Sequence, residues 1–380
     1  MKIRGFLREP ILPADITPQN IRYDFNDGCR VMTPEGNAQY SITLYNLDSG
    51  SVLETHEMTG GQQWQSRHRF YVRYGLEIRI GDRLVFRHDM DMKGKEVLLR
   101  FDSNALGDTI AWFSYAARFQ RKHGCKLGCV MNPVVAELFK TTYPDIAFFT
   151  EKEAKNLAPY ATYRLGVRYD GDGTRARFHH YQVPLDALAG YDLGMDGEIR
   201  QEPPIPSYGD LHGAGYVNEP HICLAMRASM AQKEWQREGG WDEVIAHIRR
   251  RGYRAICIDR DKKHGLHGAE DFTGDRPLTE RLRTLGNARM MVCLPSGLAW
   301  MAWMMRTPIV MISGFTQDWA EMPCRRVQNR LVCHGCWNDS ACHFKCGLAD
   351  WCPRGKDHEC TKAITPKMVI DAIDKELENK

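Results

Sequence analysis

The stretch that decides the fold reads EVLLRF (96–101), DSNALGD (102–108) and TIAWFSYAARFQRKHG (109–124). Its first part is a short, mostly apolar run, which is typical of a strand buried on both faces of a parallel sheet. Its last part places Ile110 and Phe113 at helical spacing and ends at Gly124, a suitable helix stop. The sequence therefore predicts a strand, a glycine-containing loop and a helix, in that order.

The same alternation continues downstream and is repeated once. KLGCVM (126–131) predicts a second strand and VVAELFKTTY (134–143) a second helix. A turn-rich stretch that ends in EPPIPSYGDLHGAG (202–215) predicts an interdomain linker. A second alternation then runs from HICLAMR (221–227) to TPIVMIS (307–313). Strands that alternate with helices favour parallel sheets, so two Rossmann-like lobes with a ligand in the cleft between them are expected.

The residues before this core differ from it in amino-acid composition and pattern. Up to about residue 95 the chain reads as short strands rich in β-branched and aromatic residues, separated by turns such as Asp48-Ser49-Gly50. This spacing predicts a small antiparallel barrel or sandwich. The predicted strands are AQYSITLYNL (38–47), SVLETHEM (51–58), RHRFYVRYGLEIRI (67–80) and RLVFRHDM (83–90).

Composition excludes several classes of protein. The chain has 380 residues, of which 43% are hydrophobic and 26% charged, which excludes a disordered chain. Lysine and arginine number 51 and aspartate and glutamate 48, so no broad basic surface for nucleic acid is expected. The first twenty residues lack the apolar core of a signal peptide, and the apolar run Met290–Met305 is too short and too broken to span a membrane. We therefore expect a cytoplasmic protein without membrane insertion.

A candidate catalytic residue lies in the loop after the first parallel strand. Ligands of open α/β sheets bind at the carboxyl ends of the strands, so the loop that contains Asp108 is expected to point into the cleft. A carboxylate there can accept a proton as a general base. Aspartate is also a favoured helix N-cap, so Asp108 could instead serve only to bind backbone N–H groups.

Two further strand ends carry candidate ligand-binding residues. After HICLAMR, a hydroxyl group, backbone N–H groups and two cations could hold two phosphates, although the lysine could equally be a solvated surface residue. After the strand that begins at Met290, a glycine lets backbone donors approach a phosphate, or it serves only to pack a buried helix. The predicted donor-binding residues are Arg227, Ser229, Lys233, Ser296, Gly297 and Leu298.

A cysteine cluster near the C-terminus indicates a metal site. The sequence has 13 cysteines, and Cys333 and Cys336 form a C-x2-C pair that Cys352 and Cys360 complete. Two such pairs can hold one ion in a tetrahedral site, and spacing does not separate iron from zinc. Without an evident open position, the metal is expected to be structural. Competing ligands are Cys342, Cys346, His334, His343 and His358.

These features divide the sequence into five expected parts. They are an N-terminal β domain, two Rossmann-like lobes, a four-cysteine finger and a C-terminal helix, at residues 1–95, 96–217, 218–325, 326–364 and 365–380.

The three strand-end motifs resemble those of the ADP-heptose transferases of glycosyltransferase family nine. Leu106–Ile110 resembles the motif L-G-D-x-[IV], whose aspartate is the proposed general base, and this implies that role for Asp108. Lys233-Glu234-Trp235, with Ser229 upstream, resembles the segment of this family that meets the donor diphosphate. Ser296-Gly297-Leu298 resembles the T-G-L of the motif D-T-G-L-S-H. The sequence departs from that motif at Pro295, Ala299 and Trp300.

With the β domain and the cysteine finger added, nearly the whole chain resembles the bacterial autotransporter heptosyltransferase family. The resemblance implies a GT-B fold, an iron ion on the four cysteines, and a large homo-oligomer, a dodecamer. It also implies ADP-heptose as the donor and serine residues of an autotransporter passenger domain as acceptors. Two alternatives stay open: a heptosyltransferase for the lipopolysaccharide core, and a non-catalytic protein that binds a nucleotide or a metal.

Overall fold

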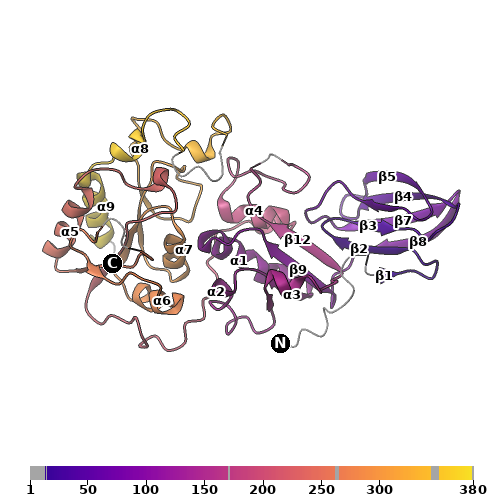
Figure 1. The fold of residues 1–380 in the computed structure, drawn as a ribbon, viewed down its shortest axis with the longest axis horizontal. Coiled ribbons are helices and arrows are strands. Elements are labelled where there is room, and N and C mark those ends of the chain that lie inside the picture. Colours follow the sequence, from indigo (N-terminus) through magenta and orange to yellow (C-terminus); the bar gives the residue numbers. More distant parts are fainter. Residues whose placement is uncertain (1–12, 14, 170–171, 262–264, 344–350, 379–380) are drawn as a thin grey trace.

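The structure is a computed structural model, and it describes residues 13, 15–169, 172–261, 265–343 and 351–378. Three bodies lie in a row along the long axis (Figure 1): a β-rich N-terminal part, a first α/β lobe in the middle, and a second α/β lobe. One hydrophobic core extends through all three. None of the helices in these residues is long and apolar enough to cross a membrane.

The first lobe is built on four parallel strands in the order β11-β10-β9-β12. The first of these strands along the chain, β9, lies between the second and the fourth. The helix that follows β9 is α1, which ends at Gly124 in the left-handed conformation. The elements are β9 (Glu96–Phe101), α1 (Leu106–His123), β10 (Lys126–Val130), α2 (Pro133–Ala136), β11 (Ala147–Phe149), α3 (Glu151–Ala154), β12 (Ala161–Leu165) and α4 (Leu185–Asp192).

The second lobe contains a parallel sheet in the order β15-β14-β13-β16-β17-β18, which is the doubly wound Rossmann order. Helix α9 packs against α5, β17 and β18. The strands are β13 (His221–Ala225), β14 (Arg254–Cys257), β15 (Glu270–Asp271), β16 (Met290–Cys293), β17 (Ile309–Ile312) and β18 (Arg325–Val327), and the helices are α5 (Gly240–Arg250), α6 (Leu278–Gly286), α7 (Gly297–Met304), α8 (Glu359–Lys362) and α9 (Pro366–Glu378).

The N-terminal strands form a sandwich. Phe25 stacks on Tyr74 with ring centroids 6.0 Å apart, and Tyr23 lies 4.9 Å from Phe86, so the strands that carry these rings pack face to face. One layer is the antiparallel sheet β5-β4-β7-β8. The strands are β1 (Asp15–Ile16), β2 (Arg22–Asn26), β3 (Arg30–Met32), β4 (Gln39–Asn46), β5 (Val52–Thr59), β6 (Gln63–Gln65), β7 (Tyr74–Ile80) and β8 (Arg83–Asp89).

The other layer of the sandwich is continuous with the first lobe. Strand β2 pairs in parallel with β12, through Ala161 opposite Phe25 and Thr162 opposite Asn26. The first-lobe sheet therefore extends through β2 to β3 and β6. The expected domain boundary at residue 95 falls between strands that share this sheet.

Two of the predicted elements are wrong in extent. The predicted helix 134–143 is only the short α2; Phe139 then stacks on Phe113 at 3.8 Å, and Pro144 disfavours a helical conformation at Tyr143. The predicted strand 67–80 begins only at Tyr74, because residues 67–73 bond elsewhere. The Tyr71 N–H, for example, donates to the Asp192 carbonyl in the first lobe.

The predicted linker contains no helix or strand between residues 199 and 220. Arg283 of α6 fixes this segment to the second lobe, because its guanidinium donates to the carbonyls of Tyr208, Asp210 and Ala214.

Candidate active site at the strand ends

The predicted catalytic residue lies in the first turn of α1. The N-cap of this helix is Ala105, so the alternative reading of Asp108 as the N-cap is wrong. Instead, the Ser103 hydroxyl donates to Asp108 Oδ2 at 2.6 Å. Burial raises the pKa of Asp108, while the Ser103 hydrogen bond and the positive charge of Lys233 both lower it. The carboxylate is thus oriented from one side and faces a cation from the other lobe.

The loops of two motifs touch directly between the lobes. A methyl group at Gly297 would lie 2.8 Å from Leu106 Cβ and 3.1 Å from the Gly107 nitrogen, and one at Gly107 would lie 2.8 Å from Trp300 Cδ1. Side chains larger than hydrogen do not fit at such distances. Helices α1 and α7 pack together behind this contact, as Figure 1 shows. The two glycines therefore let the Asp108 loop and the Ser296 loop meet.

These loops lie at the points where the strand order of each sheet reverses. In the first lobe β10 and β12 lie on opposite sides of β9, and in the second lobe β14 and β16 lie on opposite sides of β13. Asp108 follows β9, Lys233 follows β13 and Ser296 follows β16. Ligands of open α/β sheets bind at such switch points.

Lys233 ends a short 3-10 helix, η3 (Ala231–Lys233). Its ammonium nitrogen lies 5.7 Å from the centroid of the Phe315 ring. Within the described residues Lys233 forms no ion pair, so its charge is available to an anionic ligand. Ser229, four residues earlier, is exposed and Leu298 is partly exposed.

Arg227 is engaged within its own loop. Its guanidinium forms an ion pair with Glu234 at 2.8 Å, so a phosphate would have to compete with that carboxylate. Asp259 accepts hydrogen bonds from the Met226 and Arg227 N–H groups, and burial raises its pKa to about 6. Trp235 is a core residue whose indole donates to the Ile364 carbonyl.

Ser296 is the N-cap residue of α7, but its hydroxyl caps nothing. The Oγ atom is buried and has no hydrogen-bond partner among the described residues. A buried hydroxyl without a partner costs free energy, and the N-terminus of a helix attracts anions. The hydroxyl and the N-terminus of α7 together favour an anionic ligand beside Asp108.

Several thiols of the cysteine finger are neighbours, but those in the described residues form no closed metal site. Burial raises the pKa of Cys360 to about 11, and the charges of Cys333 and Cys352 contribute. Burial also raises the pKa of Cys336 to about 12; Arg354 lowers this pKa, and Cys342, Cys360 and Cys333 raise it further, so the competing ligand Cys342 is a neighbour as well. The described residues nevertheless contain no group of three or more ligands positioned to hold an ion, and Cys346 lies outside them. The cysteines in the described residues form no disulfides.

The finger joins both lobes. The Gly335 N–H donates to the Gly314 carbonyl at 2.8 Å, and the Trp337 N–H donates to the Phe315 carbonyl at 3.1 Å. On the other side, the Asn338 amide donates to the His180 carbonyl at 2.7 Å. The finger thus holds the loop after β17, whose Phe315 ring supports Lys233.

Sequence reasoning missed three residues of this site. Ser103 could have been found, because it is a hydroxyl residue in the same loop as Asp108. Trp300 was noted only as a departure from a motif, and Phe315 gave no signal, since apolar residues next to buried strands usually belong to the core. Two pockets in the described residues lie elsewhere and are lined by none of the predicted site residues.

Comparison with known proteins identifies the family. Residues 17–82 match the model of the N-terminal domain of glycosyltransferase TibC. Autotransporter heptosyltransferase TibC of Escherichia coli O78:H11 is 38% identical over 99% of this chain and 94% of its own length. The chain belongs to the autotransporter heptosyltransferase family.

Solved structures agree with this assignment. Dodecameric, iron-containing heptosyltransferase TibC in complex with ADP-D-β-D-heptose superimposes with a TM-score of 0.91 at 37% identity, covering 98% of this chain and 100% of that chain. The ADP-heptose lipopolysaccharide heptosyltransferase II of E. coli shares the fold of this heptosyltransferase at a TM-score of 0.53 and 13% identity, over 74% of this chain and 98% of that one.

The autotransporter heptosyltransferase family also includes a member named as inactive. The inactive autotransporter heptosyltransferase BimC of Burkholderia thailandensis is 35% identical over 97% of this chain and 89% of its own length. Family membership alone therefore does not establish turnover, and the geometry of the site has to support it.

Proposed function

We propose that this heptosyltransferase transfers heptose from ADP-heptose to serine hydroxyl groups of an autotransporter passenger domain. The observation that carries the proposal is that Asp108, from one lobe, is within reach of the charge of Lys233, from the other. The relatives supply the donor and the acceptor class, because TibC is an autotransporter heptosyltransferase solved with ADP-D-β-D-heptose.

In the proposed reaction Asp108 is the general base. The acceptor oxygen forms a bond to the anomeric carbon of heptose, the bond from that carbon to the diphosphate breaks, and the acceptor proton passes to the Asp108 carboxylate. The Ser103 hydrogen bond keeps one carboxylate oxygen fixed during this transfer. A single displacement of this kind inverts the configuration at the anomeric carbon, because the acceptor would attack from the side opposite the leaving diphosphate.

The second lobe would stabilise the departing diphosphate. Lys233 supplies a positive charge, and the N-terminus of α7 and the Ser296 hydroxyl, which has no partner among the described residues, supply hydrogen-bond donors. Gly297 lets the backbone approach closely. We assign supporting contacts to Arg227, Ser229 and Leu298, with Arg227 exchanging Glu234 for phosphate.

We further propose that Cys333, Cys336, Cys352 and Cys360 hold one iron ion in a structural role, with zinc as the alternative. A set of four thiols suits either metal, and their mutual electrostatic effects indicate that they are neighbours. The iron-containing dodecamer of TibC supports both the metal and a dodecameric assembly for this chain. We also propose that the two lobes form a GT-B fold and that the domains follow the five ranges given above. The protein is proposed to be cytoplasmic.

The test is co-expression with a passenger domain, followed by intact-mass measurement of that domain. The wild-type chain should add heptose units, while Asp108→Asn should lower the rate at least about 100-fold because it removes the base. ADP binding, measured by calorimetry, should be retained in Asp108→Asn, since the change leaves Lys233 in place. Asp82→Asn, at an exposed turn, is the matched control.

Each other result has a defined meaning. Transfer by Asp108→Asn at the wild-type rate would exclude the base assignment. An unmodified passenger domain together with a modified lipopolysaccharide-core acceptor would favour the lipopolysaccharide enzyme. ADP binding without transfer to either acceptor would place this chain with its inactive relative.

A further inference from the structure

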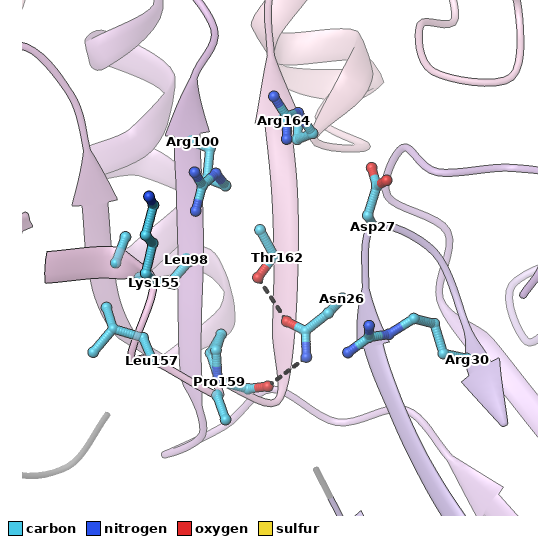
Figure 2. Close-up of a pocket in the computed structure, with 12 residues that line it drawn as sticks. Asn26, Asp27, Arg30, Leu98, Arg100, Lys155, Leu157, Pro159, Thr162 and Arg164 are labelled. Carbon is cyan, nitrogen blue, oxygen red and sulfur yellow. Dashed lines mark hydrogen bonds between the residues drawn. The ribbon is translucent and has the colours of Figure 1, made fainter. Parts of the chain in front are cut away.

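A second candidate site lies away from Asp108 and Lys233, where the first lobe meets the sandwich. A pocket of about 280 Å³ opens on the sheet between β9, β12 and β2 (Figure 2). The connection from Ala154 to Pro159 forms one wall. Four of the lining side chains are cationic and one is a carboxylate; they are Arg30, Arg100, Lys155, Arg164 and Asp27.

The floor of the pocket is polar and fixed. Thr162 of β12 lies opposite Leu98 of β9 and Asn26 of β2 in the parallel register. The Thr162 hydroxyl donates to Asn26 Oδ1 at 2.6 Å, and the Asn26 amide donates to the Pro159 carbonyl at 2.8 Å. Both bonds are drawn in Figure 2. A ligand would therefore meet a preformed surface.

Two arginines stand side by side above this floor. Arg164 lies opposite Arg100 in the register of β12 and β9, on the same face as Thr162 and Leu98. Like charges directly opposite each other on neighbouring strands destabilise a sheet. Each of the two already pairs with a carboxylate, Glu151 for Arg100 and Asp102 for Arg164, which offsets this repulsion. An anion bound between them would contact both guanidinium groups.

The carboxylates that pair with these arginines do not line the pocket. Arg100 pairs with Glu151 and Arg164 pairs with Asp102. Arg100 Nε is buried and has no hydrogen-bond partner in the described residues. Lys155 lies on the wall opposite β12 and forms no ion pair in the described residues. The pocket thus offers unused donors to a ligand.

We propose that this pocket binds the phosphoryl group of a small phosphorylated molecule. Its donors come from β9, from β12 and from the Ala154–Pro159 connection, so they converge from several directions. A tetrahedral oxyanion can accept from several directions at once, whereas a planar carboxylate accepts mainly in its own plane. The volume suits a phosphate with a small organic group, at about the lower limit of small-molecule sites. The proposal is independent of the activity assigned to the cleft.

The experiment measures binding to the full chain by calorimetry, with saturating ADP present so that the cleft is filled. Inorganic phosphate and glucose 6-phosphate are the phosphoryl probes, and acetate is the planar probe. We expect saturable phosphoryl binding that is about tenfold weaker in Arg100→Gln, a few-fold weaker in Lys155→Gln, and weaker at high salt. Lys152→Gln is the matched control, because Lys152 is exposed on α3 and does not line the pocket.

Three results would overturn the proposal. They are no phosphoryl binding either with or without ADP, equal binding by wild type and both variants, or acetate binding as tight as phosphate. If Arg100→Gln fails to fold, Lys155→Gln alone decides, since Lys155 has an exposed position outside the strands.

Discussion

At the scale of single residues, the pKa of Asp108 determines the pH range in which the proposed base is ionised. Burial raises this pKa, and Ser103 and Lys233 oppose the rise. A base acts only when deprotonated, so activity should fall as the pH drops through the pKa of Asp108. A higher pKa moves this loss to a higher pH.

Ser103→Ala should therefore shift the acid limb of the pH–rate profile to higher pH. The change removes the 2.6 Å hydrogen bond that stabilises the ionised carboxylate. The measurement is kcat/KM as a function of pH for wild type and variant. Ser103→Thr keeps a hydroxyl and should restore the wild-type profile; an unshifted limb in Ser103→Ala would exclude a role of Ser103 in setting this pKa.

At the scale of elements, the contact between the Asp108 loop and the Ser296 loop depends on two glycines. Gly297→Ala should force the loops apart, because its new methyl group would lie 2.8 Å from Leu106 Cβ. Overpacking of this kind costs about 1–3 kcal/mol of stability, and a displacement of about 1 Å in an active site can lower the rate about 100-fold.

The check is to measure Tm and kcat in the same preparation. Gly197→Ala is the control, since a methyl group there meets no atom within 4 Å and the backbone is not in the left-handed region. A Gly297→Ala variant with wild-type kcat would show that the close approach of the loops is dispensable.

The loop after β17 links the finger to the donor side of the cleft. Phe315→Leu should remove the cation–π contact that positions the Lys233 ammonium group. We expect KM for ADP-heptose to rise about threefold to tenfold, with a smaller effect on kcat. Phe315→Tyr keeps the ring and should preserve KM. If leucine and tyrosine give the same KM, the ring does not position Lys233.

Much of this element structure could be predicted because its signals are local. Buried apolar runs such as HICLAMR and IVMI predicted the parallel strands of the second lobe, and the helical patterns between the runs indicated that the sheet is parallel. The pairing of β2 with β12 could not be predicted, since long-range pairing in a parallel sheet leaves no mark in either strand. The same holds for the site. Motifs indicated Asp108, Lys233 and Ser296, whereas the support of Lys233 by Phe315 depends on the folded chain.

At the scale of the whole molecule, the finger connects the two lobes, so the metal proposed for it should affect more than its own loop. Cys360→Ser should lose the bound iron and lower Tm by about 5 °C or more, because a short polar segment without an ion has little core of its own. Metal analysis and calorimetry on the purified protein provide the measurement. Cys324→Ser, outside the finger, should keep both the metal and the Tm.

Two results would contradict this prediction. Full iron content in Cys360→Ser would exclude Cys360 as a ligand. Loss of iron without a change in Tm would show that the finger is held by its protein contacts alone, such as those of Gly335 and Asn338.

The seam between β2 and β12 limits how this protein can be trimmed or recombined. A chain that starts at β9 would leave β12 as an unpaired edge strand with exposed backbone groups. Such edge strands pair with other chains and promote aggregation. The N-terminal segment is thus no detachable accessory. A chimera that takes about the first ninety residues from a relative receives only the N-terminal strands of a shared sheet. Its β2 therefore has to pair with the β12 of the other protein before the chimera can fold.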